Sequence, residues 1–256
     1  MNVGQKCILI TGAAFGIGRA TAKLFAERGW FVGAFDVDAA GLTSLQGELG
    51  EGVFLSLDVS DPHAIAGALD QFGIATNGRL DILFSNAGID AKGSFCDMEW
   101  ERIERVVAVN LLGAMALIKA AYPLLARTDG SLCLSTASAS AIFGVPGMAV
   151  YSATKHAIKG MTEALSVEFA SCGIRAADLI PGIIDTGMLT PEHKAMLPKE
   201  RMWRPLPARE VAEAAWAAYG GDKLHNYVPQ ELGELVIEAA KRPEAIRDRR
   251  VAGSPF

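Results

Sequence analysis

The chain has 256 residues, half of them apolar, and a formal net charge of −5. This composition is enough for one buried core, and we expect a single domain over residues 1–256 because no linker or repeat divides the chain. The negative charge and scattered cations exclude nucleic acid as the main partner, and no uncharged apolar run is long enough to span a membrane.

The four cysteines, Cys7, Cys96, Cys133 and Cys172, stand apart from one another without metal-ligand spacing. The N-terminus shows no signal-peptide pattern, so we expect a cytoplasmic protein with reduced thiols. The histidines show no grouping either, and no metal is implied.

Short apolar runs alternate with longer helical patterns along the chain. The strand candidates are 7–10, 31–35, 53–57, 82–85, 132–135, 175–179 and 226–228. They are continuous apolar stretches, which is typical of strands covered on both faces. The helical patterns between them are 18–28, 39–49, 61–75, 100–126, 151–170 and 208–218. This alternation predicts an α/β fold, a doubly wound (Rossmann-like) parallel sheet with helices on both faces, which binds ligands at the carboxyl ends of its strands.

A glycine-rich segment, Gly12-Ala-Ala-Phe15-Gly16-Ile17-Gly18, joins the first strand to the first helix. Gly12 permits a tight turn, Gly16 allows the backbone to approach a pyrophosphate, and Gly18 allows close packing of helix on strand. The helix N-terminus then offers free N–H groups to the phosphates. The segment therefore predicts a dinucleotide site.

Asp36 ends the second strand candidate, eighteen residues after Gly18. An acidic residue near this offset accepts hydrogen bonds from the adenosine ribose hydroxyls and repels a 2′-phosphate. Neither Phe15 nor Val37 supplies the basic group that would attract such a phosphate. The sequence therefore favours NAD over NADP.

Tyr151 and Lys155 lie four residues apart, on one face of a predicted helix. Lowering a tyrosine pKa from about 10 to about 7 requires about 4 kcal/mol, and the nearby ammonium can supply it. Tyr151 could then serve as a general acid or base. A serine past the fifth strand could hold the substrate oxygen, and chemistry alone leaves Ser135, Ser138 and Ser140 as rivals.

These motifs resemble the short-chain dehydrogenase/reductase family, in its compact single-domain branch, over roughly residues 5–230. The thirteen-residue offset to Tyr151 selects Ser138 in that family. The resemblance adds Asn110 as a fourth catalytic residue, whose side chain and distorted helix hold a water that links Lys155 to solvent.

Further cofactor contacts are implied by the resemblance. Asp58 and Val59 would flank the adenine, the 86–88 turn would lie near the adenosine ribose or serve structure only, and the 181–186 segment would orient the nicotinamide. The full cofactor-binding set is Gly12, Phe15, Gly16, Ile17, Gly18, Asp36, Asp58, Val59, Asn86, Ala87, Gly88, Tyr151, Lys155, Pro181, Gly182, Ile184 and Thr186.

By resemblance, residues 187–206 form a substrate lid. Its apolar side chains and those near Ser138 predict an adaptable apolar pocket. The pocket candidates are Ala139, Phe143, Met148, Met188 and Trp203. They favour a bulky, fairly apolar secondary alcohol or ketone, although the same residues could simply pack the lid. Arg201 and Arg204 are the alternative, for an acidic substrate.

Residues 230–256 depart from the family pattern. We expect a helix over 231–241 and then a solvated, mixed-charge tail. The basic cluster there is Lys241, Arg242, Arg247, Arg249 and Arg250. The resemblance implies a homo-oligomer, and this unusual ending leaves dimer and tetramer both open.

The sequence therefore predicts an NAD(H)-dependent oxidoreductase that acts on a small-molecule secondary alcohol or ketone, with Tyr151 as general acid/base. A non-catalytic dinucleotide sensor of the same fold is an alternative from another class, and the intact Tyr151 and Lys155 argue against it. A ketoacyl-type reductase is a third interpretation. Asp36 counts against it, because such reductases generally use NADPH.

Overall fold

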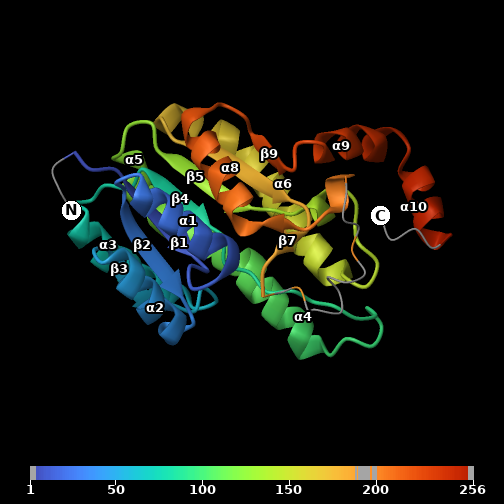
Figure 1. The fold of residues 1–256 in the computed structure, drawn as a ribbon, viewed down its shortest axis with the longest axis horizontal. Helices are drawn as coiled ribbons and strands as arrows, with labels where there is room; N and C mark the ends of the chain where they lie inside the picture. The colour runs from blue at the N-terminus through green and yellow to red at the C-terminus, as the bar shows by residue number, and fades with distance from the viewer. Residues whose placement is uncertain (1–3, 188, 190–196, 198–200, 253–256) are drawn as a thin grey trace.

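A seven-stranded sheet runs through the middle of the computed structural model (Figure 1), which describes residues 4–187, 189, 197 and 201–252. The strands are β1 (Cys7–Thr11), β2 (Phe31–Asp36), β3 (Val53–Ser56), β4 (Ile82–Ser85), β5 (Leu132–Thr136), β6 (Arg175–Pro181) and β9 (His225–Val228). All neighbours pair in parallel, in the order β3-β2-β1-β4-β5-β6-β9. The order of strands therefore reverses between β1 and β4, and such a point is where this kind of sheet binds ligands.

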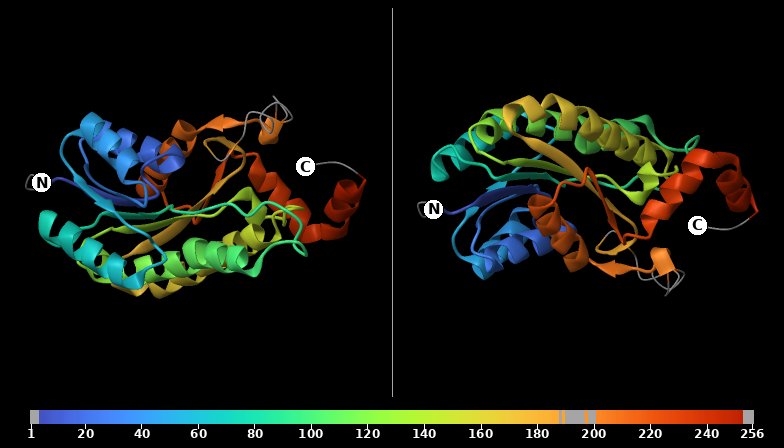
Figure 2. Two further views of the ribbon diagram at one scale, coloured as in Figure 1. Left: turned by 90° about the horizontal axis from the view of Figure 1, so that it is seen from below. Right: turned by 90° about the horizontal axis from the view of Figure 1, so that it is seen from above.

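Helices cover both faces of the sheet (Figure 2). One face carries α1 (Gly16–Glu27), α2 (Ala39–Leu49) and α8 (Ala208–Gly220). The other carries α3 (Pro62–Ala75), α5 (Gly113–Ala126) and α6 (Ala149–Glu168). The predicted doubly wound α/β fold is confirmed.

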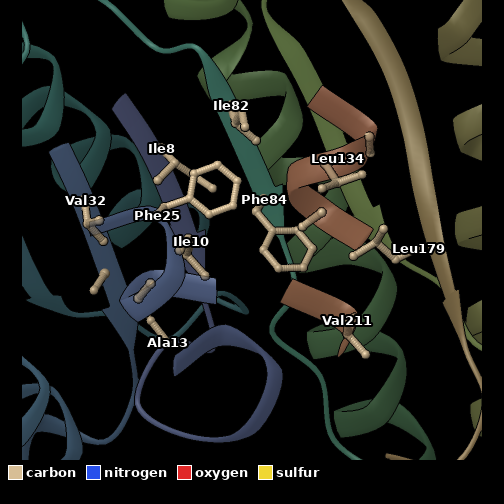
Figure 3. Packing of buried hydrophobic residues seen from close by; sticks show 14 of the residues in the cluster. Ile8, Ile10, Ala13, Phe25, Val32, Ile82, Phe84, Leu134, Leu179 and Val211 are labelled. Atoms are coloured by element: carbon tan, nitrogen blue, oxygen red, sulfur yellow. The ribbon is translucent and has the colours of Figure 1, made fainter. Parts of the chain in front are cut away.

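Alternate residues of β1 point into two separate cores. Ile8 and Ile10 pack beneath α1 and α8, together with Phe25 and Val211 (Figure 3). Leu9, between the two isoleucines, faces the opposite layer of helices. Burial of each such side chain contributes about 1.5–3 kcal/mol, so this strand is firmly fixed in the centre of the molecule. The loop that follows it is correspondingly well anchored.

The helix expected over 100–126 consists of three parts. It runs as α4 (Trp100–Val107), a π-helical turn (Ala108–Leu112) and α5. By length and composition the stretch Trp100–Ala126 could cross a membrane. However, 44% of the apolar 18-residue segment within it is buried in the molecule. Helix α5 packs against α3 and β4, so the core accounts for its buried apolar residues, which include Leu117, Ile118 and Leu125.

The C-terminal segment is more ordered than the sequence suggested. After a cis Val228–Pro229 peptide, the chain forms α9 (Leu232–Lys241) and then α10 (Pro243–Val251). Both helices lie at one end of the molecule (Figures 1 and 2). Four of the five basic side chains, Lys241, Arg242, Arg247 and Arg249, are exposed as expected, whereas Arg250 is half-buried and Ile246 of α10 is buried. The helix is held because this apolar side chain is covered by other parts of the chain.

The segment before α8 is described in part. A short strand, β8 (Leu206–Pro207), pairs with β7 (Ile184–Asp185) and follows a 3-10 turn at Arg201–Trp203. Of the lid expected over 187–206, residues 187, 189, 197 and 201–206 are described. Met188 lies outside the described residues.

Candidate active site

A cavity of about 710 Å³ lies at the carboxyl ends of the central strands. Its wall contains the residues that follow or end β1, β2, β4, β5 and β6, as expected for this fold. The predicted site residues that line it are Gly12, Phe15, Gly16, Ile17, Asp36, Asn86, Ala87, Gly88, Ser138, Ala139, Met148, Tyr151, Lys155, Pro181, Gly182, Ile184, Thr186 and Trp203. Segments from across the chain thus meet in one space.

Some predicted residues stand behind the wall of the cavity. The residues that do not line it are Gly18, Asp58, Val59, Asn110 and Phe143. The Asp58 carboxylate accepts hydrogen bonds from Ser60 and pairs with Arg105 at 2.9 Å. The contacts of Asp58 and Val59 with adenine stay a prediction.

The glycine loop forms a cradle with no room for side chains. Gly12 and Gly16 have φ angles of 68° and 52°, which favour glycine. A Cβ atom on Gly12 would lie 2.9 Å from the Ala87 Cα, and one on Gly16 would lie 3.0 Å from the Thr186 Cγ2. Helix α1 begins after Phe15 without a side-chain cap, so its first N–H groups remain available to an anion. The loop therefore fits the pyrophosphate of a dinucleotide.

Asp36 has a second role that the sequence did not suggest. One of its carboxylate oxygens accepts a hydrogen bond from the Ala14 N–H, and the other accepts from the Asp38 N–H, both at 2.9 Å. The residue thus braces the glycine loop from the end of β2. Each carboxylate oxygen has a further lone pair, which leaves capacity for ribose hydroxyls.

The Asn86 side chain ties three strand ends together. Its Nδ2 donates to the Thr11 carbonyl at 3.0 Å, and its Oδ1 accepts from the Thr136 hydroxyl at 3.0 Å. These bonds connect the ends of β1, β4 and β5 at the floor of the cavity. They favour the structural role of the 86–88 turn over a side-chain contact with the cofactor.

Ser138, Tyr151 and Lys155 come together on one wall of the cavity. Ser138 follows β5, and the interaction of its hydroxyl with Tyr151 acts to lower the pKa of the tyrosine. Tyr151 and Lys155 lie one turn apart in α6, with the lysine Nζ 5.6 Å from the tyrosine ring centroid. The same Nζ donates to the Thr136 carbonyl at 2.7 Å. The predicted catalytic group is therefore assembled before any ligand binds.

Burial controls the titration of both catalytic side chains. It raises the pKa of Tyr151; the Ser138 hydrogen bond opposes this rise, and the Asp90 charge adds to it. Burial also lowers the pKa of Lys155 to about 8. The expected lowering of the Tyr151 pKa is wrong for the cofactor-free chain. The cost of placing a phenolate in this apolar environment outweighs the stabilisation available to it.

Asn110 lies in the π-helical turn and links two elements behind the cavity. Its Oδ1 accepts from the Ile89 N–H at 2.8 Å, and its Nδ2 donates to the Ile89 carbonyl at 2.9 Å. A longer bond of 3.4 Å reaches the Thr154 hydroxyl in α6. The distorted helix implied by the resemblance is present, and the water relay through Asn110 stays a prediction.

A comparison with known proteins identifies the family to which this chain belongs. The sequence pattern of the short chain dehydrogenase family matches residues 6–196. This chain belongs to that family.

Relatives of this short-chain dehydrogenase span most of its length. Oxidoreductase UcpA of Escherichia coli (strain K12) is 33% identical over 241 residues, which cover 90% of this chain and 85% of that protein. The 2-keto-3-deoxy-L-fuconate dehydrogenase of Xanthomonas campestris pv. campestris is 33% identical, with 93% of this chain and 74% of that protein covered. The crystal structure of 3-ketoacyl-(acyl-carrier-protein) reductase from Brucella melitensis, complexed with NADH, aligns with a TM-score of 0.79 and 30% identity. That alignment covers 89% of this chain and 98% of that one.

The cavity of this short-chain dehydrogenase also contains charged residues that sequence reasoning missed. Asp90 and Lys92 follow β4 and form an ion pair at 3.2 Å, and their place just after the 86–88 turn was a usable signal. Arg250 of α10 lines the cavity as well, although its place in the basic C-terminal cluster predicted a solvated side chain. Arg204, which we considered for an acidic substrate, is 3.8 Å from Glu231 and does not line the cavity.

Proposed function

We propose that this chain is an NAD(H)-dependent oxidoreductase that transfers a hydride between nicotinamide and a secondary alcohol or ketone. One observation carries the proposal: the glycine loop, whose first helical N–H groups can bind an anion, lines the same cavity as the Ser138–Tyr151 pair. A dinucleotide held by the loop and a substrate held by the pair would share that space.

Tyr151 holds the proton that the reaction moves. In oxidation its phenolate oxygen accepts the proton of the substrate hydroxyl, and in reduction its hydroxyl returns a proton to the carbonyl oxygen. NAD, when bound, supplies the carbon that accepts or donates the hydride and, in the oxidised state, a positive charge. Ser138 donates a hydrogen bond that keeps the substrate oxygen against the tyrosine.

Lys155 stabilises the phenolate that forms in this step. With a pKa of about 8, its amine is mostly protonated at pH 7. The bond to the Thr136 carbonyl fixes the ammonium on the cavity wall, so its charge favours the ionised form of Tyr151. We attribute the rest of the decrease in the Tyr151 pKa that catalysis requires to the binding of cofactor and substrate.

NAD is the cofactor that the cavity favours. The Asp36 carboxylate lines the wall beside the glycine loop, where it can accept hydrogen bonds from ribose hydroxyls and repel a 2′-phosphate. The 3-ketoacyl reductase to which the chain is similar is complexed with NADH, which agrees with this choice.

The substrate end of the cavity supports a bulky and fairly apolar compound. The apolar residues there are Ala139, Val145, Met148, Leu189 and Trp203. A wall of this kind excludes water and gains free energy by covering apolar surface. A second candidate, reduction of a ketoacyl group, is favoured by the likeness to the 3-ketoacyl reductase.

The protein acts as a homo-oligomer in this proposal. Large apolar side chains are exposed along α4 and α5, where Trp100 is 65%, Leu112 56% and Met115 42% exposed. Large exposed apolar side chains of this kind are typical of an interaction site when they form one patch. Light scattering that finds only monomers at micromolar concentration would contradict an oligomer formed through these helices.

The test of the activity is the appearance of NADH from NAD⁺ with a panel of secondary alcohols, aryl alcohols, hydroxysteroids, hydroxy acids and hydroxyacyl thioesters. We expect turnover with at least one class, and Tyr151→Phe should lose most of it while binding NADH normally. Tight NADH binding without turnover across the panel would favour the non-catalytic sensor. Turnover that survives in Tyr151→Phe would remove the tyrosine from the mechanism.

A further inference from the structure

Arg250 reaches the cavity from α10, which packs against the loop that follows Ser138. Its Nη1 donates to the Gly144 carbonyl at 2.7 Å, and its guanidinium carbon lies 5.1 Å from the Phe143 ring centroid. Gly144 is next to Val145, which lines the cavity and whose N–H binds the Ser152 hydroxyl beside Tyr151. The guanidinium is therefore placed at the substrate end, beside the loop that precedes the catalytic tyrosine.

Two buried polar atoms in this region have no hydrogen-bond partner. Among the residues that the structure describes, the Arg250 Nε and the Ser140 Oγ are the buried side-chain nitrogen and oxygen atoms of which this is true. Both residues line the same cavity. A buried donor without a partner costs about 1–3 kcal/mol, so Ser140 and Arg250, which both line the cavity, each lack one acceptor.

The charge of Arg250 is also uncompensated. None of the ion pairs between described residues includes it, whereas its neighbour Arg249 pairs with Glu238 at 2.7 Å. Burial lowers the pKa of Arg250, and the nearby Arg249 charge lowers it further. Arg250 is half-buried, and a cation that has lost part of its hydration gains free energy from an anionic partner.

The other charged residues of the cavity do not supply that partner. Asp36 accepts bonds from the glycine loop at the end of β2. Asp90 pairs with Lys92, and Lys155 is bound to the Thr136 carbonyl. One cation with a fork of donors matches one carboxylate, while a phosphate dianion would need more positive charge than Arg250 offers.

We infer that Arg250 determines substrate specificity by binding a carboxylate that the substrate carries away from its reacting carbon, with the Ser140 hydroxyl as a second donor. The substrate class is then a secondary hydroxy acid and the corresponding keto acid, with an apolar body between the two ends. This inference rests on the proposed function and narrows its substrate.

The test compares acids with neutral compounds of the same size. The substrates are hydroxy acids with the hydroxyl on the penultimate carbon, from four to ten carbons long, and their primary amides. We expect the wild type to show a kcat/KM for the best acid at least tenfold above that for its amide, because a charge-assisted hydrogen bond is worth about that much.

Substitutions assign this preference to Arg250. Arg250→Met should bring the ratio of acid to amide close to one, mainly by raising the KM for the acid. Arg250→Lys should retain part of the preference. Arg247→Met is the matched control, because Arg247 lies on the same helix, pairs with Asp248 at 2.8 Å and is 63% exposed. It should leave the ratio unchanged.

A binding measurement, which requires no turnover, tests the role of Arg250 separately from the proposed oxidoreductase activity. Octanoate and octanamide, which cannot be oxidised by this reaction, are titrated into the NADH complex of the wild type and of Arg250→Met. Octanoate should bind the wild type at least tenfold more tightly than octanamide does, and the variant should lose this difference. Circular dichroism melting confirms that the variant is folded.

Three results would overturn the inference. These are equal use of acids and amides by the wild type, an unchanged ratio in Arg250→Met, or an equal loss for both compounds with a lowered melting temperature, which would indicate a purely structural arginine. By contrast, Tyr151-dependent turnover of neutral alcohols alone would uphold the proposed function and reject the carboxylate. Arg250-dependent octanoate binding with no turnover of any compound would refute the proposed function instead.

Discussion

A single methyl group added at Gly18 should weaken cofactor binding strongly in a protein that still folds. A Cβ atom there would lie 2.0 Å from the Gly12 carbonyl oxygen and 2.7 Å from its carbon. An ordinary contact between carbon and oxygen is about 3.3 Å, so Gly18→Ala must push helix and loop apart by about 1.3 Å.

The expected cost has two parts. Overpacking of this size destabilises a core by about 1–3 kcal/mol. Moving the loop by more than 1 Å also disrupts the bonds from its N–H groups to an anion, each worth about 1.5–3 kcal/mol. We therefore expect the Kd for NADH to rise about 10- to 100-fold, in a protein that still folds.

Gly160→Ala is the matched control for Gly18→Ala. Gly160 is exposed in α6, and a Cβ atom on it would meet nothing within 4 Å. This substitution should stabilise the protein by about 0.5–1 kcal/mol because alanine favours the helix. Urea unfolding and NADH fluorescence titration measure both quantities. Equal NADH affinity and equal stability in the two variants would refute the account of the loop.

Two further variants test the electrostatics of the cavity. Asp36→Ala should reduce the ratio of NADH to NADPH affinity about tenfold, and an unchanged ratio in fluorescence titrations would remove Asp36 from the cofactor argument. Lys155→Met tests the buried ammonium: the pKa of Lys155 is lowered from 10.5 to about 8, so the unfolded chain binds more protons between these values. The resulting penalty is complete below pH 8 and disappears toward pH 10.5. From pH 7.5 to 9.0 the cofactor-free wild type should gain about 1 kcal/mol relative to the variant in urea unfolding, and parallel stabilities would contradict a lowered pKa.

The strands were predictable because each is a continuous apolar run between two helical layers. The first was expected over 7–10 and is Cys7–Thr11, and the fifth was expected over 132–135 and is Leu132–Thr136. The proximity of Tyr151 and Lys155 was predictable for a related reason: they lie one helical turn apart, so their contact is local. Features that depend on residues close together in the chain can be predicted from the sequence.

Features fixed by distant contacts could not be predicted from the hydrophobic pattern, and only the family resemblance implied a distorted helix around Asn110. The π-helical turn at Ala108–Leu112 accompanies bonds from Asn110 to the backbone of Ile89, and the hydrophobic pattern of the helix carries no trace of them. Arg250 meets Gly144 across 106 residues of sequence. Its surroundings in the sequence are highly charged, so composition suggested solvent where the fold provides a cavity.

The placement of Arg250 also bears on how such a protein can diversify. The segment common to the family, residues 6–196, contains the glycine loop and Tyr151, while α9 and α10 lie beyond it and α10 contributes Arg250 to the cavity wall. Grafting these two helices between relatives would alter what enters the cavity without touching the residues that move the proton. In the proposed mechanism, the residues that move the proton and the arginine that selects the substrate lie on separate stretches of this chain, so selectivity could change while the reacting residues are preserved.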